Sequence, residues 1–297
     1  MNFHQSVMPL PGIIPANRLD VLVDQLIDSL RRIEYIYHIR DHDHDERRKD
    51  PNSDLFDPLK AAALHGRQGD HDEAFWLVFL ATHFGKHAID GWQLCRDVYG
   101  RLGQAPFWTW DQLIADAPAF GQWLRENVAR LRTDGVSRRF SNHRKYESIV
   151  APRGAGTPEV VQSFAEWVLE AGDNRRLIVA AHQAVGQHPG ETFDYLYTAM
   201  NRVRRFGRLA KFDYLTMLGK LHLAPIEPPS AYLSEATGPL RGARLLFDND
   251  ANSATTAAVL EDRAQLLNQH LNVGMQALED SMCNWQKSPT IYRYFKG

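Results

Sequence analysis

The 297-residue chain has few of the features that mark secreted or membrane-spanning proteins. Its two cysteines, Cys95 and Cys283, are too few for a disulfide framework and favour a reducing compartment. No apolar run reaches membrane-spanning length, and the first residues lack a basic segment followed by an apolar core. We therefore expect a cytoplasmic protein with no membrane partner.

The sequence also has little strand-like alternation, no internal repeat and no phosphate loop ending in Gly-Lys-Ser/Thr. Apolar residues instead recur at three- and four-residue steps from Leu19 to Tyr37, which predicts an amphipathic helix. The apolar run at 75–80 predicts a central helix over residues 70–88. Further helices are expected at 92–103, 109–115, 116–132, 157–170, 173–185 and 190–203. Two more are expected within 255–287, with a break near 272–274. The predicted fold is mostly α.

The net charge of −2 argues against a general nucleic-acid coat, but the basic residues are unevenly distributed. Residues 125–153 carry eight Arg and Lys against three Asp and Glu, and residues 200–220 carry six against one. If these two blocks meet in the fold, they form one electropositive face.

Residues 140–150, FSNHRKYESIV, are called the polar segment here. They combine an imidazole, two cations, a phenol, a carboxylate and amide and hydroxyl groups within seven positions. Such density is typical of a surface that grips an anion and carries out proton chemistry beside it. The alternative is a basic helix start or a solvated loop. The residues concerned are Asn142, His143, Arg144, Lys145, Tyr146, Glu147 and Ser148.

Residues 201–211, NRVRRFGRLAK, are called the basic segment here. On a helix, Arg204, Arg208 and Lys211 align, and Arg205 lies three residues before Arg208. Asp213 is the only acid nearby, which favours phosphate as the partner of these cations. The alternative is the solvated edge of a helix.

Two pairs of side chains elsewhere are candidate ligand contacts. His83 and His87 share one helical face but lack a third metal ligand, so we expect anion or substrate contacts at a pocket rim. The alternative is one core and one surface histidine. Trp108 and Trp110 can stack on bases, although core packing is the default for tryptophan.

Three further stretches complete the candidates. Residues 40–50, RDHDHDERRKD, are expected to form a polar loop and not a metal site, and no cofactor is expected. The APRGAG turn at 151–156, followed by Thr157-Pro158, is compatible with a helix–hairpin–helix that holds phosphate at the second helix's start. Residues 237–247 add the cation Arg241 between two glycines.

The sequence FSNHRKYESI resembles the signature of the α-glutamyl/putrescinyl-thymine pyrophosphorylases, specifically the clade also called amino acid:DNA transferases. Residues 75–87 (FWLVFLATHFGKH), 92–110 (WQLCRDVYGRLGQAPFWTW) and 237–247 (TGPLRGARLLF) resemble the same family. Together these stretches cover most of residues 70–250. The family pattern has Gly where this chain has Ser141.

The resemblance implies a fold similar to helical DNA glycosylases of the helix–hairpin–helix type, in one compact unit. We expect an N-terminal arm and helices at 1–69, a glycosylase-like catalytic core at 70–250, and C-terminal helices at 251–297 that pack on the core. The implied activity is displacement of pyrophosphate from a pyrophosphoryloxymethyl-uracil in DNA by an amine or amino acid. The DNA is expected to be phage DNA, with the base flipped out of the stack.

Roles follow from this implied chemistry. The amine must lose a proton, the leaving diphosphate must be neutralised, and the flipped base must be stacked. Two alternatives remain: a DNA glycosylase excising modified bases, for instance against phage, and a non-catalytic DNA-binding module. The candidate catalytic bases are His143, Glu147 and Asp213; the candidate substrate and phosphate contacts are Asn142, Arg144, Lys145, Arg205, Arg208, Lys211, Arg241, His83 and His87; the candidate stacking residues are Tyr146, Trp108 and Trp110.

Overall fold

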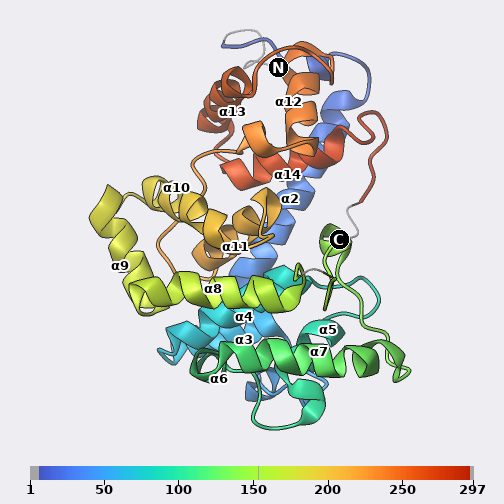
Figure 1. The fold of residues 1–297 in the computed structure, drawn as a ribbon. Coiled ribbons are helices and arrows are strands. Elements are labelled where there is room, and N and C mark those ends of the chain that lie inside the picture. The colour runs from blue at the N-terminus through green and yellow to red at the C-terminus, as the bar shows by residue number, and fades with distance from the viewer. Residues whose placement is uncertain (1–6, 153, 295–297) are drawn as a thin grey trace. The chain divides into compact units, whose positions relative to one another are not determined.

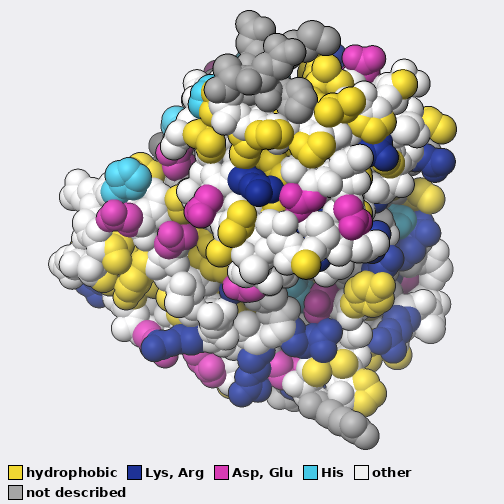
Figure 2. Space-filling model, turned by 90° about the horizontal axis from the view of Figure 1, so that it is seen from above, with side chains coloured by type: hydrophobic (Ala, Val, Ile, Leu, Met, Phe, Trp, Pro, Cys, Tyr) yellow, Lys and Arg dark blue, Asp and Glu magenta, His cyan; other side chains and the backbone are white. Residues whose placement is uncertain are grey.

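The computed structural model describes residues 7–152 and 154–294, which are mostly helical. Within these residues the chain forms thirteen α-helices and no strand, apart from an isolated bridge between His87 and Gly91. The predicted mostly α fold class is therefore confirmed. None of the helices in these ranges is long and apolar enough to cross a membrane. Acidic, basic and hydrophobic side chains are interspersed over the face shown in Figure 2.

The chain divides into two compact units (Figure 1). The first comprises Met1–Ile36 and Pro228–Lys296, and the second comprises Tyr37–Glu227. The first unit contains η1 (Pro11–Ile13), η6 (Leu233–Glu235), α12 (Gly238–Asp248), α13 (Ala257–Leu271) and α14 (Met275–Trp285), while α2 (Arg18–Asp41) runs from this unit into the second. The second unit contains η2 (Glu46–Arg48), α3 (Pro58–Arg67), α4 (His71–Phe84), α5 (Gln93–Tyr99), η3 (Arg101–Gly103), α6 (Trp110–Ala115), α7 (Ala117–Thr133), η4 (Asn142–Arg144), α8 (Thr157–Ala171), α9 (Asn174–Val185), α10 (Pro189–Ala199), η5 (Met200–Arg202) and α11 (Arg208–Lys220).

The first unit has its own apolar core around the contact of α12 with α14. Gly242 permits this contact, because a Cβ at its position would lie 2.2 Å from the carbonyl oxygen of Met282. Trp285 is fully buried in the same core and donates its indole N–H to the carbonyl of Arg18 at 3.1 Å. Close helix packing and a large buried aromatic thus hold this unit together.

In the second unit, α4 is the central helix, as predicted. Every residue of α4 from Glu73 to Phe84 is buried. Phe79 stacks on Phe164 of α8 with ring centroids 3.8 Å apart, and Trp76 donates its indole N–H to the carbonyl of Trp108 at 2.7 Å. These contacts fix α4 between α8 and the segment that leads into α6.

The polar stretch at 40–50 is tied to the helix before it. His42 and His44 donate ring N–H groups to the carbonyls of His38 and Ile39, at 3.1 and 2.7 Å. Asp45 caps η2 by accepting from the backbone N–H of Arg47. Within residues 7–152 and 154–294, no group of three or more His, Cys, Asp or Glu side chains is arranged to hold a metal ion.

A carboxyl group is buried in the core of the second unit. Glu73 accepts hydrogen bonds from the Tyr99 hydroxyl at 2.8 Å and from the Trp110 backbone N–H at 2.6 Å, so it joins α4 to α5 and α6. Burial raises the pKa of Glu73 from 4.5 to about 7, against the opposing effect of these two hydrogen bonds.

We predict that Glu73 lowers stability as the pH rises. Because its pKa is higher in the folded chain, its contribution is fully present below about pH 4.5 and is lost as the pH passes 7. The neutral Glu73→Gln variant lacks this dependence. Between pH 4 and pH 8 the unfolding free energy of the wild type, measured in urea, should fall by roughly 3 kcal/mol relative to that of Glu73→Gln. The exposed Glu126→Gln is the control. Parallel pH profiles for wild type and Glu73→Gln would contradict the prediction.

Candidate functional site

The end of α4 positions the start of the polar segment. The last carbonyl groups of a helix have no partner inside it and require outside donors. The backbone N–H of Ser141 donates to the carbonyl of Phe84 at 3.0 Å, and Nε of Arg144 donates to the carbonyl of Thr82 at 2.8 Å. The polar segment thus satisfies the C-terminal end of the central helix.

Arg144 also connects the polar segment to α11. Its side chain is 8% exposed, and Nη2 lies 2.7 Å from Oδ2 of Asp213. Two of the guanidinium nitrogens are therefore bound inside the protein, as is one oxygen of Asp213. In this geometry Arg144 orients the polar segment, and Asp213 is its counter-ion.

His83 holds the far end of the polar segment. Nε2 of His83 lies 2.9 Å from Oγ1 of Thr157, and that hydroxyl donates to the carbonyl of Ser148 at 3.1 Å. Because the hydroxyl has one hydrogen, His83 must donate from Nε2. Burial, with the nearby charges of Arg144 and Arg205, lowers the pKa of His83 to about 3, so the ring is neutral. His83 is thus a buried hydrogen-bonded residue and not a rim contact.

Gly85 follows α4 and lies directly against the polar segment. Its φ of +66° and ψ of 159° belong to a region that L-residues rarely adopt. A Cβ there would also lie 2.0 Å from Oγ of Ser141. Both the conformation and the close approach therefore require glycine.

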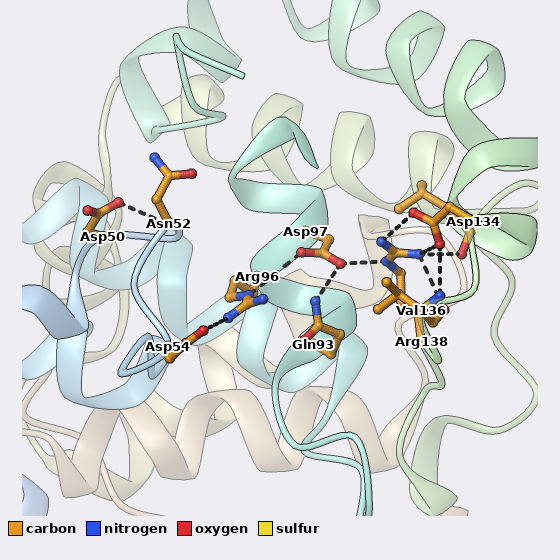
Figure 3. A network of polar contacts seen from close by, with 10 residues as sticks. Asp50, Asn52, Asp54, Gln93, Arg96, Asp97, Asp134, Val136 and Arg138 are labelled. Carbon is orange, nitrogen blue, oxygen red and sulfur yellow. Dashed lines mark hydrogen bonds and ion pairs between the residues drawn. The ribbon is translucent and has the colours of Figure 1, made fainter. Parts of the chain in front are cut away.

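The residues that lead into the polar segment are anchored by ion pairs (Figure 3). Arg138, whose side chain is 4% exposed, pairs with Asp97 of α5 and with Asp134 at the end of α7. Arg139 pairs with Asp90 at 2.7 Å, which lowers the pKa of Asp90 to about 2. Asp97 and Asp90, which neutralise these arginines, therefore lie far from them in sequence, whereas Asp134 lies only four residues before Arg138.

The polar and basic segments meet in the fold, as the charge distribution suggested. Nη2 of Arg205 donates to the carbonyl of Tyr146 at 3.3 Å, and Nε lies 3.5 Å from Oε2 of Glu147. Arg144 also pairs with Asp213, which lies two residues after the basic segment, so a second link joins these parts of the chain. The contacts also show that Arg205 has a carboxylate partner, contrary to the expectation of unpaired cations.

The exposed side chains of the polar segment are those that a ligand can reach. Asn142, His143, Lys145 and Tyr146 are exposed. Tyr146 is 80% exposed, with Nζ of Lys145 5.2 Å from its ring centroid. The side chain of Glu147 is 17% exposed. This places a cation, an imidazole, an amide, an aromatic face and a carboxylate within six residues.

Several other candidates lie elsewhere. Lys211 is buried, with Nζ 2.7 Å from Oδ1 of Asn201 and 3.9 Å from the Tyr197 ring centroid. Arg208 is half-buried, and its guanidinium lies over the Phe212 ring at 5.4 Å. These positions give Lys211 a packing role and leave Arg208 partly accessible.

Trp108 and Trp110 are core residues, 5% and 2% exposed, in place of the stacking role expected for them. His87 is half-buried, and Nδ1 accepts from the backbone N–H groups of Ile89 and Asp90. Arg241 belongs to α12 of the first unit. Within the second unit, the hydrogen bonds and ion pairs described above for the polar segment involve neither the two tryptophans nor His87.

The start of α8 differs from the expected phosphate site. The N–H of Gly156 donates to Oε2 of Glu159 at 2.9 Å, and the N–H of Thr157 donates to the carbonyl of Ser148 at 2.9 Å. Pro158 has no N–H. The amides of Gly156 and Thr157 are thus used inside the protein.

Sequence reasoning missed the acids that pair with Arg138 and Arg139, just before the polar segment, and the Thr157 hydroxyl that contacts its far end. The separation of Asp134 and Arg138 by four residues was a usable signal. Asp90, Asp97 and Thr157 gave none, because their partners lie 49, 41 and 74 residues away in sequence.

We predict that Arg144 and Asp213 are energetically coupled. In a double-mutant cycle of Arg144→Gln and Asp213→Asn, the coupling in unfolding free energy should be about 1–3 kcal/mol, because the guanidinium is buried. The cycle of Arg205→Gln and Glu147→Gln is the matched control. Its longer and more exposed pair should give less than about 1 kcal/mol. Equal coupling in both cycles would refute the anchoring role of Arg144.

We also predict that Gly85→Ala destabilises the protein by about 1–3 kcal/mol more than Gly69→Ala. Both glycines have positive φ, but a Cβ at Gly69 meets nothing within 4 Å. Unfolding in urea measures both losses. In a Ser141→Gly background the excess should shrink, because the clashing side chain is gone. An unchanged excess would show that the contact with Ser141 is not its cause.

The comparisons with known proteins agree with the resemblance seen in the sequence. The model of the alpha-glutamyl/putrescinyl thymine pyrophosphorylase clade 3 family matches residues 17–297, nearly the whole chain. Comparisons with curated proteins and with solved structures gave no match. With its polar segment held by the end of α4 and by α11, the chain belongs to the alpha-glutamyl/putrescinyl thymine pyrophosphorylase family, clade 3.

Proposed function

We propose that the protein is a transferase that displaces pyrophosphate from a pyrophosphoryloxymethyl-uracil in DNA with an amine or amino acid. Family membership supports the action on modified thymine. The observation that carries the proposal is the contact of Arg205 with Tyr146 and Glu147, which gathers cations and a carboxylate beside the exposed residues of the polar segment.

In the proposed reaction the amine nitrogen attacks the methylene carbon of the modified base. A C–N bond forms, the C–O bond breaks, and pyrophosphate leaves with the electron pair. Negative charge on the leaving group grows in the transition state and requires preorganised cations. Lys145 and Arg205 are accessible enough to meet it, while Arg144 fixes the backbone of the polar segment that carries Lys145.

The amine must also lose a proton. Glu147, partly exposed beside Arg205, and His143, exposed in η4, are the two side chains of the polar segment able to accept it. Asp213 is less suited, because one of its oxygens accepts from Arg144 at 2.7 Å. We assign Asp213 to positioning, and the proton acceptor to Glu147 or His143.

The base must leave the DNA stack to reach these groups. Tyr146, 80% exposed, offers an aromatic face on which an extruded base can stack. The same proposal includes a likeness to helical DNA glycosylases of the helix–hairpin–helix type. It also includes phage DNA as the substrate.

A second candidate function is DNA binding without catalysis. The observation that favours it is the exposure of Asn142, His143, Lys145 and Tyr146, because a binding surface displays its side chains and a catalytic site encloses them. Excision of the modified base by a glycosylase uses the same surface, with Glu147 as the carboxylate near the sugar.

One experiment separates the three activities. The full chain is incubated with DNA containing pyrophosphoryloxymethyl-uracil and with an amine, and the nucleosides are analysed by mass spectrometry. Released pyrophosphate together with an aminated nucleoside supports the transferase. Abasic sites indicate a glycosylase. Salt-sensitive DNA binding with neither product indicates a binding module.

We predict that Lys145→Ala lowers turnover about 10- to 1000-fold, the scale of losing one preorganised electrostatic contact. DNA affinity should fall far less, because the leaving-group charge arises only in the transition state. Lys49→Ala, whose charge pairs with Glu46, is the control and should keep full turnover. If Lys145→Ala lowers affinity and turnover in equal proportion, Lys145 grips DNA without assisting departure of pyrophosphate.

We further predict that Glu147→Gln lowers turnover if Glu147 accepts the amine proton. Part of this loss should disappear at higher pH, where more amine is already deprotonated. His143→Gln tests the other acceptor in the same assay. A pH-independent loss in Glu147→Gln would assign Glu147 to holding Arg205 and leave His143 as the acceptor.

A further inference from the structure

The loop that follows α4 is held in one conformation by its own hydrogen bonds. His87 and Gly91 exchange two backbone hydrogen bonds, at 3.0 and 2.9 Å, which close a short turn between them. Nδ1 of His87 also accepts from the backbone N–H groups of Ile89 and Asp90, at 3.3 and 3.1 Å. These bonds hold the backbone on both sides of Ile89, which lies at the tip of the turn.

A second loop, which follows α7, is joined to this turn. The hydroxyl of Ser137 donates to Oδ2 of Asp90 at 3.0 Å, and Arg139 donates to both oxygens of Asp90, at 2.8 and 2.7 Å. Ile89 directly precedes Asp90, and Val136, labelled in Figure 3, directly precedes Ser137. The backbones that carry Ile89 and Val136 therefore lie close together, and these two residues are called the apolar tip here.

The fold leaves the side chains of the apolar tip in solvent. Ile89 is 79% exposed and Val136 is 44% exposed. Among the large hydrophobic residues that the structure describes, only Tyr146 of the polar segment, at 80%, is more exposed than Ile89. A single exposed aliphatic side chain on a surface is ordinary. Here two of them are displayed by loops that hydrogen bonds hold together, which indicates a surface that contacts something apolar.

The apolar tip lies beside the start of the polar segment. The carbonyl of Phe84, at the end of α4, accepts from the backbone N–H of Ser141 at 3.0 Å, and Asp90 pairs with Arg139. The loop from Phe84 to Asp90 is thus bound at both ends to residues 139–141, where the polar segment begins. The apolar tip is therefore next to the part of the chain that carries the groups proposed to act on DNA.

The charge around the apolar tip favours DNA as the partner. Residues 85–92 and 132–140 carry four Arg and Lys against two Asp. Lys86 and Arg132 are exposed, and within residues 7–152 and 154–294 they take part in no ion pair. An aliphatic tip flanked in sequence by exposed cations suits a DNA duplex, in which phosphates surround an apolar stack of bases.

We propose that the apolar tip inserts into the base stack of duplex DNA, with Ile89 entering the gap that the extruded base leaves. This inference rests on the proposed function, because it takes DNA as the substrate, and it names the residue that keeps the stack open. Aliphatic side chains inserted between base steps unstack them, and one that fills the gap replaces contacts that the extruded base has lost. Because the turn is already held in place, little conformational freedom is lost on insertion.

The test compares two DNA duplexes of the same sequence, neither of which carries a modified base. One has a tetrahydrofuran abasic analogue in place of a thymidine, and the other is intact. An aliphatic side chain enters the gap of the first duplex without unstacking a base. The full chain should therefore bind this duplex roughly tenfold more tightly, the scale of burying one aliphatic side chain. Fluorescence anisotropy measures both affinities, and equal affinity for the two duplexes, or binding to neither, would overturn the proposal.

Two variants of Ile89 and one control assign the preference to the tip. Ile89→Ser should make the two affinities equal, whereas Ile89→Leu keeps an aliphatic side chain and should keep most of the preference. Ile114→Ser changes a residue of α6 that is 37% exposed and lies outside the tip, so it should behave as the wild type does. Circular dichroism checks that each variant is folded. A preference that survives in Ile89→Ser, or that is lost equally in Ile114→Ser, would refute insertion by Ile89.

The outcome is independent of the transferase assay, because neither duplex contains the modified base and no amine is added. A preference that depends on Ile89, found in a protein that forms no aminated nucleoside, would leave the insertion standing and refute the proposed reaction. Amine transfer by a protein with equal affinity for the two duplexes would refute the insertion alone.

Discussion

The buried guanidinium of Arg144 is the contact on which the candidate site depends. It joins a carbonyl at the end of α4 to Asp213 of α11 and fixes the polar segment between them. A buried charge is costly unless its hydrogen-bonding groups are matched. The carbonyl of Thr82 has no partner within the helix. Its hydrogen bond with Arg144 therefore gives the carbonyl a donor and the buried guanidinium an acceptor. Removing either partner would leave an unsatisfied polar group next to the central helix.

This anchoring divides the polar segment into two groups of residues. Those that face inward, with Arg144 and Ser141 foremost, determine where the backbone lies. Those that face outward, with Lys145 and Tyr146 foremost, are available to a ligand. A rigid support with exposed functional groups is what preorganised electrostatic catalysis requires, since the cations need not move when charge develops. The same geometry serves a binding surface, which is why product analysis decides between the two functions.

Local pattern was sufficient to predict some features and insufficient for others. The apolar run at 75–80 predicted the central helix because complete burial leaves a continuous apolar stretch. The excess of cations predicted that the two basic blocks lie near each other. It did not predict their partners, because Arg139 pairs with an acid 49 residues away. Lys211 and Trp110 were both candidate ligand contacts, with core packing as the default for the tryptophan, and the packing shows that both are buried.

The sequence by itself determined the helical fold class, the family and the stretch in which chemistry-bearing side chains concentrate. These properties reside in periodicity and in motifs, which are local. The tertiary structure decided which side chains of that stretch face a ligand. It made Arg144 an anchor and left Lys145, its neighbour, exposed. It also joined the two loops that carry Ile89 and Val136. Burial and ion pairing depend on which distant segments come together, and spacing along the chain does not encode that information.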